Sequence, residues 1–352
     1  ARHGSRANRG LRQNHFHHTD SGQVSRWLER NWARLSPLAL ALYPLSLIFR
    51  SIVALRRAAY AVGLMSAVRL PVPVVVVGNI SVGGTGKTPL VLWLAHFLRQ
   101  HGYEPGIVSR GYGTRNGEPL AVSPTGAPPR FGDEPVLLAQ RSESPVWICA
   151  DRVAAAHALL AAHPSCDVVL SDDGLQHYRL ERDFEIAVID GTRGLGNRLM
   201  LPAGPLREPP SRLKQVDAVT INGSESRALA EPNTFAMYLE GRQFRNLLNP
   251  GHTVDADFFQ RQRVLAIAGI GNPGRFFAHL NRLGISFQAQ SFPDHHVYTA
   301  SDLDGADADA IVMTEKDAVK CSAFASEKHW VLPVDAVPDP ELGELLLRKL
   351  KL

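Results

Sequence analysis

Residues 74–89 read VVVVGNISVGGTGKTP and restrict the possible folds more than any other stretch. The valine run predicts a buried strand, and a glycine-rich turn then leads through Gly86-Lys87-Thr88 into a helix-compatible segment. This is the layout of a P-loop, where backbone N–H groups and a helix N-terminus receive phosphates, so we expect ATP or GTP. The predicted nucleotide-binding residues are Ser81, Val82, Gly83, Gly84, Thr85, Gly86, Lys87 and Thr88.

The loop departs from the usual G-x-x-x-x-G-K-[ST] pattern, because Ser81 stands where the first glycine is expected. Gly83 and Gly84 still supply an unhindered backbone. Lys87 supplies an ammonium group for the β- and γ-phosphates, and Thr88 supplies a hydroxyl that can bind Mg²⁺. The alternative interpretation is an ordinary glycine-rich turn between a strand and a helix.

Length and composition indicate a globular protein of two domains. The chain has 352 residues, 45% of them hydrophobic, and roughly 150 residues per domain is a fair prior. Cys149, Cys166 and Cys321 are odd in number and widely spaced, without a metal-binding pattern. We therefore interpret them as reduced thiols in a cytosolic setting.

The positive charge is concentrated at the N-terminus. The first 70 residues carry a net charge of +9, and the remainder carries −5. Residues 1–22 lack apolar periodicity and are interpreted as a flexible tail. Residues 27–65 contain a twelve-residue apolar run, 38–49, which includes Pro44. This run is shorter than the roughly 20 residues needed to span a bilayer, so we predict an interfacial helix on an anionic membrane surface.

This N-terminal segment has three other possible interpretations. A secretory signal would carry a nucleotide site away from its nucleotide. A helix packed on the main domain remains open, and both roles can hold for different faces of one helix. Nucleic-acid binding is not expected, because basic and aromatic residues do not interleave in the pattern of a known module.

Short apolar segments recur after the P-loop and alternate with helix-compatible segments at 90–100 and 152–162. Continuous apolar strands separated by helices predict a parallel sheet covered on both faces, with chemistry in the loops at the strands' carboxyl ends. The predicted strands are 106–109, 146–149, 168–171, 186–190 and 218–221.

A second, smaller α/β domain is predicted after a strand-like linker near residues 234–245. The expected organisation is a tail at 1–22, a P-loop domain at 23–235 that includes the interfacial helix, and a smaller domain at 236–352. In that smaller domain we predict strands at 264–268, 286–292, 311–313 and 330–333, and helices at 275–283 and 341–352.

Asp172 and Asp173 end a hydrophobic strand, which in a P-loop protein is the position of a metal-binding acid. One of them is expected to hold Mg²⁺; the alternative is a pair of acids that cap a turn. His177, four residues beyond, is interpreted as a loop hydrogen-bonding residue.

Two further loops follow predicted strands or are rich in glycine and proline. In SRGYG, Arg110 could hold a phosphate and Tyr112 could stack on a sugar, although a plain turn fits the spacing equally well. In GDEP, Asp133 or Glu134 could accept a proton from a nucleophilic hydroxyl, and the alternative is a solvated helix cap.

The second domain carries its own candidates. In FPDHHVY, His295 could pair with a carboxylate across the domain cleft, whereas adjacent histidines do not make a metal site by themselves. Thr314 is a helix N-cap candidate, and Lys316 is a candidate for a phosphate or ion-pair contact. The G-x-G-x-x-G pattern at 269–274 matches a dinucleotide fingerprint but contains Pro273 in the turn, so we do not favour that function.

Taken together, the motifs GNISVGGTGKTP, SRGYG, GDEP, SDDGLQH, LPAGPLREP, IAGIGNPGRFF, FPDHHVY and MTEKDAVKC occur in the order typical of one family. Over residues 35–321 the chain resembles tetraacyldisaccharide 4′-kinases, the lipid A 4′-kinases of Gram-negative bacteria. The resemblance implies a P-loop NTPase-like domain with a second α/β domain at the cytoplasmic face of the inner membrane. It also implies transfer of the ATP γ-phosphoryl group to the 4′-hydroxyl of a tetraacyldisaccharide 1-phosphate.

The resemblance also assigns roles to matching positions. Asp133 matches the family's catalytic aspartate and His295 its partner, so domain closure would bring the two together. Lys87 and Thr88 match the phosphate and Mg²⁺ groups, and Asp172 and Asp173 match the acids near the metal. Arg207 and the Arg110–Tyr112 loop match motifs on the substrate side. The implied partners are the lipid substrate and an anionic membrane, without nucleic acid or an obligate protein partner.

Other classes are kept as alternatives. A membrane ATPase of the partitioning type would carry a lysine where this chain has Val82. A nucleotide-dependent scaffold anchored by residues 27–65 would retain its function after Lys87→Met. A dinucleotide oxidoreductase would bind NAD(P).

Overall fold

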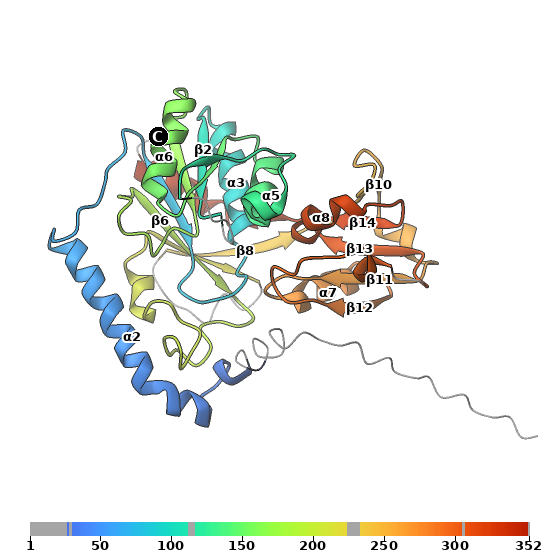
Figure 1. The fold of residues 1–352 in the computed structure, drawn as a ribbon, viewed down its shortest axis with the longest axis horizontal. Coiled ribbons are helices and arrows are strands. Elements are labelled where there is room, and N and C mark those ends of the chain that lie inside the picture. Colours follow the sequence, from blue (N-terminus) through green and yellow to red (C-terminus); the bar gives the residue numbers. More distant parts are fainter. Residues whose placement is uncertain (1–26, 28–29, 112–116, 224–232, 305–306, 351–352) are drawn as a thin grey trace, which may run out of the picture.

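The computed structural model describes residues 27, 30–111, 117–223, 233–304 and 307–350. It contains two sheets, which form the cores of the two domains in Figure 1. The larger sheet has nine strands, in the spatial order β15 (Asp335–Pro338), β8 (Thr234–Glu240), β7 (Ala218–Asn222), β6 (Phe184–Asp190), β1 (Val74–Gly78), β5 (Val168–Asp172), β2 (Pro105–Ser109), β4 (Val146–Ile148) and β3 (Leu120–Ala121).

The first domain has the predicted architecture. From β8 to β4 all neighbouring strands run parallel, and only the two edge strands β15 and β3 are antiparallel. Buried valines of β1 contribute alternately to apolar cores on the two faces of the sheet, as expected for a covered parallel strand. One face packs on α3 (Lys87–Gln100), α5 (Asp133–Arg141) and α9 (Glu341–Leu350), and the other packs on α6 (Arg152–Ala162). The short helix α4 (Pro128–Phe131) precedes α5.

The second domain is built on a six-stranded sheet, covered on one face by α7 (Pro273–Arg282) and on the other by α8 (Glu315–Cys321). Its strands, in spatial order, are β10 (Thr253–Val254), β9 (Phe244–Asn246), β14 (His329–Leu332), β13 (Ala310–Thr314), β11 (Val264–Ala268) and β12 (Phe287–Ser291). The 3₁₀ helices among the described residues are Pro210–Lys214, Ala256–Phe259, Ala300–Leu303 and Ser322–Phe324.

The boundary between the domains differs from the predicted division at residue 236. Strand β8 belongs to the larger sheet, and the chain returns to that sheet through β15 and α9. The return has a physical cause, since Leu342 and Leu346 of α9 are fully buried in the first domain's core. The second domain therefore lies within residues 241–334, and the two connecting strands pair with each other.

An ionic contact joins the domains beside these connecting strands. Arg141 of α5 is paired with Glu315 of α8, and its Nη2 lies 2.6 Å from Asp335 Oδ1. The N–H of Val334 donates to the other Glu315 oxygen at 3.2 Å. Because Glu315 is 5% exposed, α5 and α8 are held together by a largely buried charge pair.

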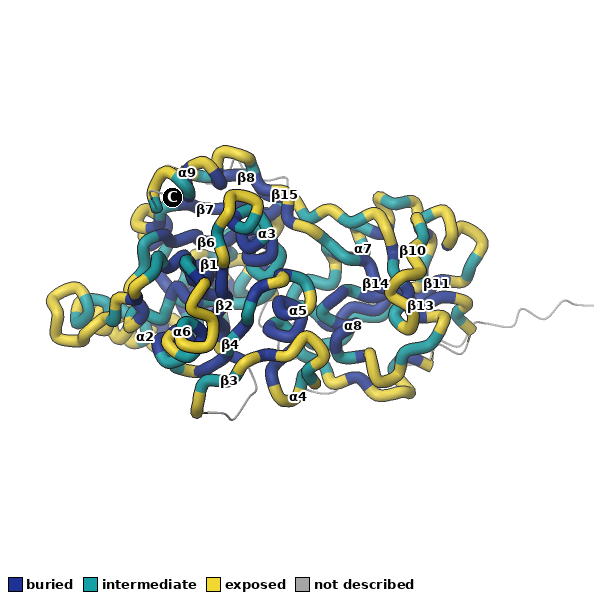
Figure 2. Tube along the Cα trace, turned by 90° about the horizontal axis from the view of Figure 1, so that it is seen from above, coloured by how far each residue is buried: buried dark blue, intermediate teal, exposed yellow. Residues whose placement is uncertain are grey.

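The N-terminal helix is longer than the predicted apolar run. α2 (Pro37–Ala61) has 25 residues and begins where Ser36 Oγ accepts a hydrogen bond from the Ala39 N–H. By length and composition it could cross a membrane, so the expectation that this segment is too short is wrong. The helix continues beyond the apolar run because the arginines that follow favour helical structure. Much of it is exposed or half-buried in Figure 2, at the outside of the first domain.

Candidate active site

The predicted P-loop lies between β1 and α3, at the carboxyl edge of the larger sheet. Gly83 and Gly86 have backbone φ angles of 96° and 99°, which residues other than glycine rarely adopt. A Cβ at Gly86 would also lie 2.3 Å from Asn222 Nδ2, and this amide donates to the Thr85 carbonyl at 2.9 Å. The tight loop leaves Lys87 and Thr88 in the first turn of α3, where phosphates are favoured.

The predicted acidic pair lies directly beside this loop, since Val77 of β1 is in register with Asp172 of β5. Lys87 Nζ is 3.6 Å from Asp173 Oδ1, and Arg207 Nη1 is 3.1 Å from Asp173 Oδ2. Burial alone would raise the pKa of Asp173, but these two cations lower it below its ordinary value. Asp173 is therefore ionised at neutral pH.

Asp172 has a different environment. It is 1% exposed, and Ser109 Oγ donates to its Oδ2 at 3.2 Å. Within the described part of the chain, its Oδ1 has no hydrogen-bond partner. Burial, helped by the charges of Glu134 and Asp173, raises the pKa of Asp172 to about 7. A buried carboxylate oxygen without a partner is what a divalent cation could satisfy, so the residues present fit Mg²⁺.

The described residues contain no cluster of three or more His, Cys, Asp or Glu side chains that could hold a metal ion. Mg²⁺ does not require such a cluster, because it is commonly bound by one or two carboxylates together with water and substrate phosphates.

Asp133 and His295 are in contact between the two domains. Asp133 is the first residue of α5, rather than part of the predicted loop, and is 7% exposed. His295 follows β12 in the second domain with a φ of 59°, and its Nδ1 lies 3.2 Å from both Asp133 carboxylate oxygens. Burial would raise the pKa of Asp133, but the hydrogen bond from His295 and the charge of Lys316 hold it far below its usual range. The same hydrogen bond raises the pKa of His295.

A second contact between the domains lies at the P-loop, and pattern reading did not anticipate it. The G-x-G-x-x-G turn packs against the loop so closely that a Cβ at Gly271 would lie 2.4 Å from the Gly84 nitrogen. Arg275 Nη2 donates to Asp190 Oδ1 across the domains at 2.6 Å. Within the first domain, Arg193 Nη2 donates to the Gly84 carbonyl at 2.7 Å and fixes the loop that Gly271 contacts. Gly84 and Gly271 therefore allow the backbones of the two loops to approach closely, and a glycine-rich motif could have suggested such a contact.

The predicted substrate residues have different surroundings. The guanidinium group of Arg207 forms an ion pair with Asp173. The backbone N–H of Arg207 donates to the Ile80 carbonyl at 2.7 Å, so the loop that contains Arg207 is hydrogen-bonded to the start of the P-loop. Arg110 is exposed at the end of β2, and Tyr112 lies outside the described residues. Pattern reading missed Arg152, a 4% exposed residue at the start of α6 near the acidic pair. The position of Arg152 shortly after the end of β4 could have suggested that it lies at the site.

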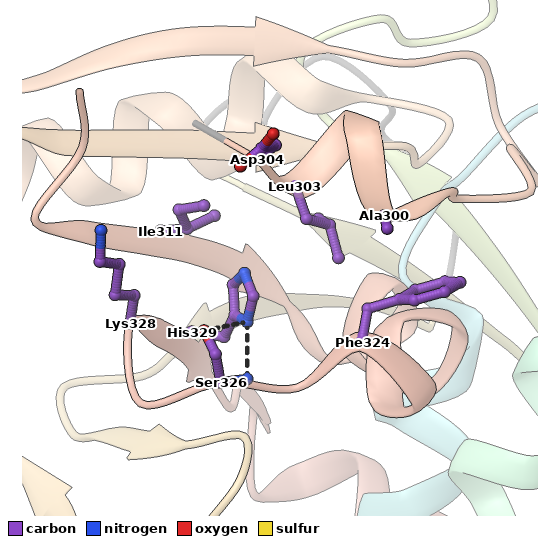
Figure 3. A pocket seen from close by; sticks show the side chains of 8 residues that line it. All are labelled: Ala300, Leu303, Asp304, Ile311, Phe324, Ser326, Lys328 and His329. Atoms are coloured by element: carbon purple, nitrogen blue, oxygen red, sulfur yellow. Dashed lines mark hydrogen bonds between the residues drawn. The ribbon is translucent and has the colours of Figure 1, made fainter. Parts of the chain in front are cut away.

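A hollow of 290 Å³ lies apart from these groups, in the second domain (Figure 3). Its lining residues are Ala300, Leu303, Asp304, Ile311, Phe324, Ser326, Lys328 and His329. His329 Nδ1 accepts a hydrogen bond from the Ser326 N–H at 2.9 Å, so this ring serves the local loop. The hollow contains none of the predicted site residues. We place the candidate active site at the P-loop, where Lys87 lies beside the acidic pair.

Comparison with known proteins identifies the family. The family model for tetraacyldisaccharide-1-P 4′-kinases matches residues 38–351. The chain belongs to the tetraacyldisaccharide 4′-kinase family. Among curated family members, the protein from Aromatoleum aromaticum is 52% identical over 323 residues, covering 91% of this chain and 96% of the relative. That from Methylobacillus flagellatus is 49% identical over 326 residues, covering 93% and 96%.

A solved structure agrees with this assignment. LpxK from Aquifex aeolicus, crystallised in complex with ATP, matches with a TM-score of 0.75 and 31% identity, covering 89% of this chain and 99% of that one. The resemblance and the fold class predicted from the sequence are therefore confirmed. As a member of the tetraacyldisaccharide 4′-kinase family, the chain is a kinase of lipid A biosynthesis. The partitioning ATPase, scaffold and oxidoreductase interpretations are set aside.

Proposed function

We propose that Asp133 and His295 form the acceptor half of a phosphoryl-transfer site whose donor half is the P-loop. In this reaction the 4′-hydroxyl of a tetraacyldisaccharide 1-phosphate attacks the γ-phosphorus of ATP. An O–P bond to the sugar forms as the bond to the β-phosphate oxygen breaks, and ADP leaves. The observation that carries the proposal is the 3.2 Å contact between His295 and Asp133. The next residue, Glu134, is near enough to Asp172 for its charge to raise the pKa of that strand-end acid, which links this pair to the P-loop side of the site.

Asp133 would accept the proton of the attacking hydroxyl. Its low pKa makes it a weak base, but phosphoryl transfer has a loose transition state in which positioning and charge stabilisation matter most. An ionised Asp133 can orient the hydroxyl and take its proton as the bond forms. Lys87 would stabilise negative charge on the β- and γ-phosphates. Thr88 with Asp172 or Asp173 would hold Mg²⁺, which when bound neutralises charge on the transferred group.

The direct test uses ATP labelled in the γ-phosphate, Mg²⁺, and tetraacyldisaccharide 1-phosphate in detergent. Label should move to the lipid at the 4′ position, in proportion to enzyme and only when the acceptor is present. Hydrolysis of ATP at a rate that the lipid does not change, with no labelled lipid, would contradict the proposed reaction and return the partitioning-type ATPase to consideration.

We also propose that α2 holds the kinase on the cytoplasmic face of the inner membrane, where ATP meets a lipid acceptor. Leu45, Ile48 and Ile52 are more than half exposed on this helix. The segment around it carries the excess of arginine, and apolar side chains beside arginines suit an anionic bilayer surface. The helix is also fixed to the first domain, because Ser46 Oγ donates to the Met200 carbonyl at 2.8 Å.

The membrane role predicts a specific loss of binding. The double variant Ile48→Asp/Ile52→Asp should move the protein from the lipid fraction to the soluble fraction in flotation with anionic phospholipid vesicles. Each aspartate would place a negative charge on the apolar face of the helix, where an anionic bilayer surface repels it. Leu248→Asp, at a similarly exposed position in the second domain, is the matched control and should float like the wild type. Equal flotation of the double variant would contradict the role of α2.

A further inference from the structure

Lys316 lies between the two domains and faces carboxylates from both. It is the second residue of α8, and its side chain is 14% exposed. Its Nζ is 2.9 Å from Glu134 Oε1 in the first domain and 3.0 Å from Asp294 Oδ1 in the second. The same nitrogen lies 3.8 Å from Asp133 Oδ2. One lysine therefore faces three acids, including the proposed base.

Without this cation the acids would repel one another where the two domains meet. Asp133 and Glu134 are adjacent in the first turn of α5, and Asp294 lies within reach of the same ammonium group from the second domain. Three like charges around one position would favour rotation of the carboxylates or separation of the domains, most strongly at Asp133, which is largely buried. Lys316 offsets that repulsion at the position where the domains meet.

Lys316 is also linked to His295, through the carboxylate of Asp294. Asp294 immediately precedes His295, and its Oδ1 accepts both the Lys316 ammonium at 3.0 Å and the His295 backbone N–H at 3.1 Å. The left-handed backbone of His295 is a conformation that needs support from its surroundings. A fixed Asp294 gives that support, so one ammonium group constrains both members of the Asp133–His295 pair.

We propose that Lys316 is a positioning residue for phosphoryl transfer, which holds Asp133 and His295 in their reactive orientation when the two domains are in contact. This inference rests on the proposed role of Asp133 as the base. Lys316 acts through the pair and does not touch the reacting atoms. The same contact links domain closure to the formation of the catalytic pair, because the lysine and the base come from different domains.

The pH profile separates positioning from a purely structural role. Burial raises the pKa of Asp133, while His295 and Lys316 lower it, and the lowering prevails. Removal of Lys316 should therefore raise the pKa of Asp133, and the acidic limb of kcat/KM should move to higher pH. Loss of packing alone would reduce the amount of active enzyme without moving this limb.

The experiment uses the full chain with Lys316→Met and Lys316→Arg, assayed by label transfer from ATP to the lipid acceptor. Lys316→Met should lower kcat about 10²-fold, as expected for a misplaced catalytic group, with the dissociation constant of ATP within about twofold of the wild-type value. Lys316→Arg keeps the charge and should recover most of kcat. Lys328→Met, which removes an exposed lysine of the same domain, is the matched control and should match the wild type.

A double variant with Asp133→Ala completes the test. If Lys316 acts through Asp133, adding Lys316→Met to Asp133→Ala should lower the residual kcat by less than about threefold. Multiplication of the two single losses, or wild-type kcat and pH profile in Lys316→Met, would overturn the inference. Wild-type turnover in Asp133→Ala alone would instead overturn the proposed base, so the two failures are distinguishable. The Lys316→Arg variant keeps the test valid if Lys316→Met does not fold.

Discussion

Replacement of Asp133 with alanine is expected to lower kcat about 10³-fold, within the range found when a general base is lost. The dissociation constant of ATP should change little, because we expect the P-loop, and not α5, to bind the nucleotide. The physical reason is the position of this carboxylate, which is 7% exposed, ionised and 3.2 Å from His295. Steady-state label transfer gives kcat, and calorimetric titration with ATP gives the affinity.

The control for this prediction is Asp309→Ala. Asp309 also pairs with a cation, but on an exposed surface of the second domain, where Arg263 Nη2 lies 2.8 Å away. Its loss should leave kcat and ATP affinity unchanged, since exposed pairs contribute little. Near-normal turnover of Asp133→Ala would eliminate this residue as the base, and a parallel loss of ATP affinity would indicate a damaged P-loop cleft instead.

Lys87→Met is expected to reduce kcat by about 10²–10³-fold, the usual effect of removing one donor that stabilises transition-state charge. The variant should also bind ATP more weakly, because the lysine is predicted to contact the β- and γ-phosphates. Its loss leaves Asp173 with one fewer cation, since Lys87 Nζ lies 3.6 Å from that carboxylate. Label transfer and nucleotide titration measure the two effects.

Lys349→Met provides the comparison for Lys87→Met. Lys349 forms a 3.0 Å pair with Asp217, but its side chain is 51% exposed and lies at the end of α9. Turnover and ATP affinity of this control should equal those of the wild type. Full activity of Lys87→Met would mean that the P-loop lysine has no part in transfer, which is the outcome that a nucleotide-dependent scaffold predicts.

Much of the fold could be predicted from local pattern. The valines of β1 and the buried run of β5 read as covered parallel strands, and both were located to within a residue or two. The strand at Val264–Ala268 coincides with its prediction. Such strands can be predicted from the sequence because a strand buried on both faces needs an uninterrupted run of apolar residues. The prediction that residues 335–350 belong to the second domain is wrong, because an amphipathic helix such as α9 does not indicate which core receives its apolar face.

Part of the candidate site could also be predicted locally. Lys87, Thr88 and the acidic pair follow strand ends, and the carboxyl ends of neighbouring parallel strands meet at one edge of a sheet. The pairing of Asp133 with His295 rested on the family resemblance, because 162 residues separate them in the chain. The predicted contact is present in the structure, whereas their catalytic roles remain a proposal.

Local patterns in the sequence predict the nucleotide site, the parallel sheet and the family, because a P-loop and strand-end acids are tied to short-range geometry. The sheet and the family are confirmed, and the surroundings of the predicted site follow from the tertiary structure. It revealed the longer α2, the return of β15 and α9 to the first domain, the contact of Gly271 with Gly84, and the three acids around Lys316. These features depend on which distant surfaces pack together, and no local pattern in the chain specifies that choice.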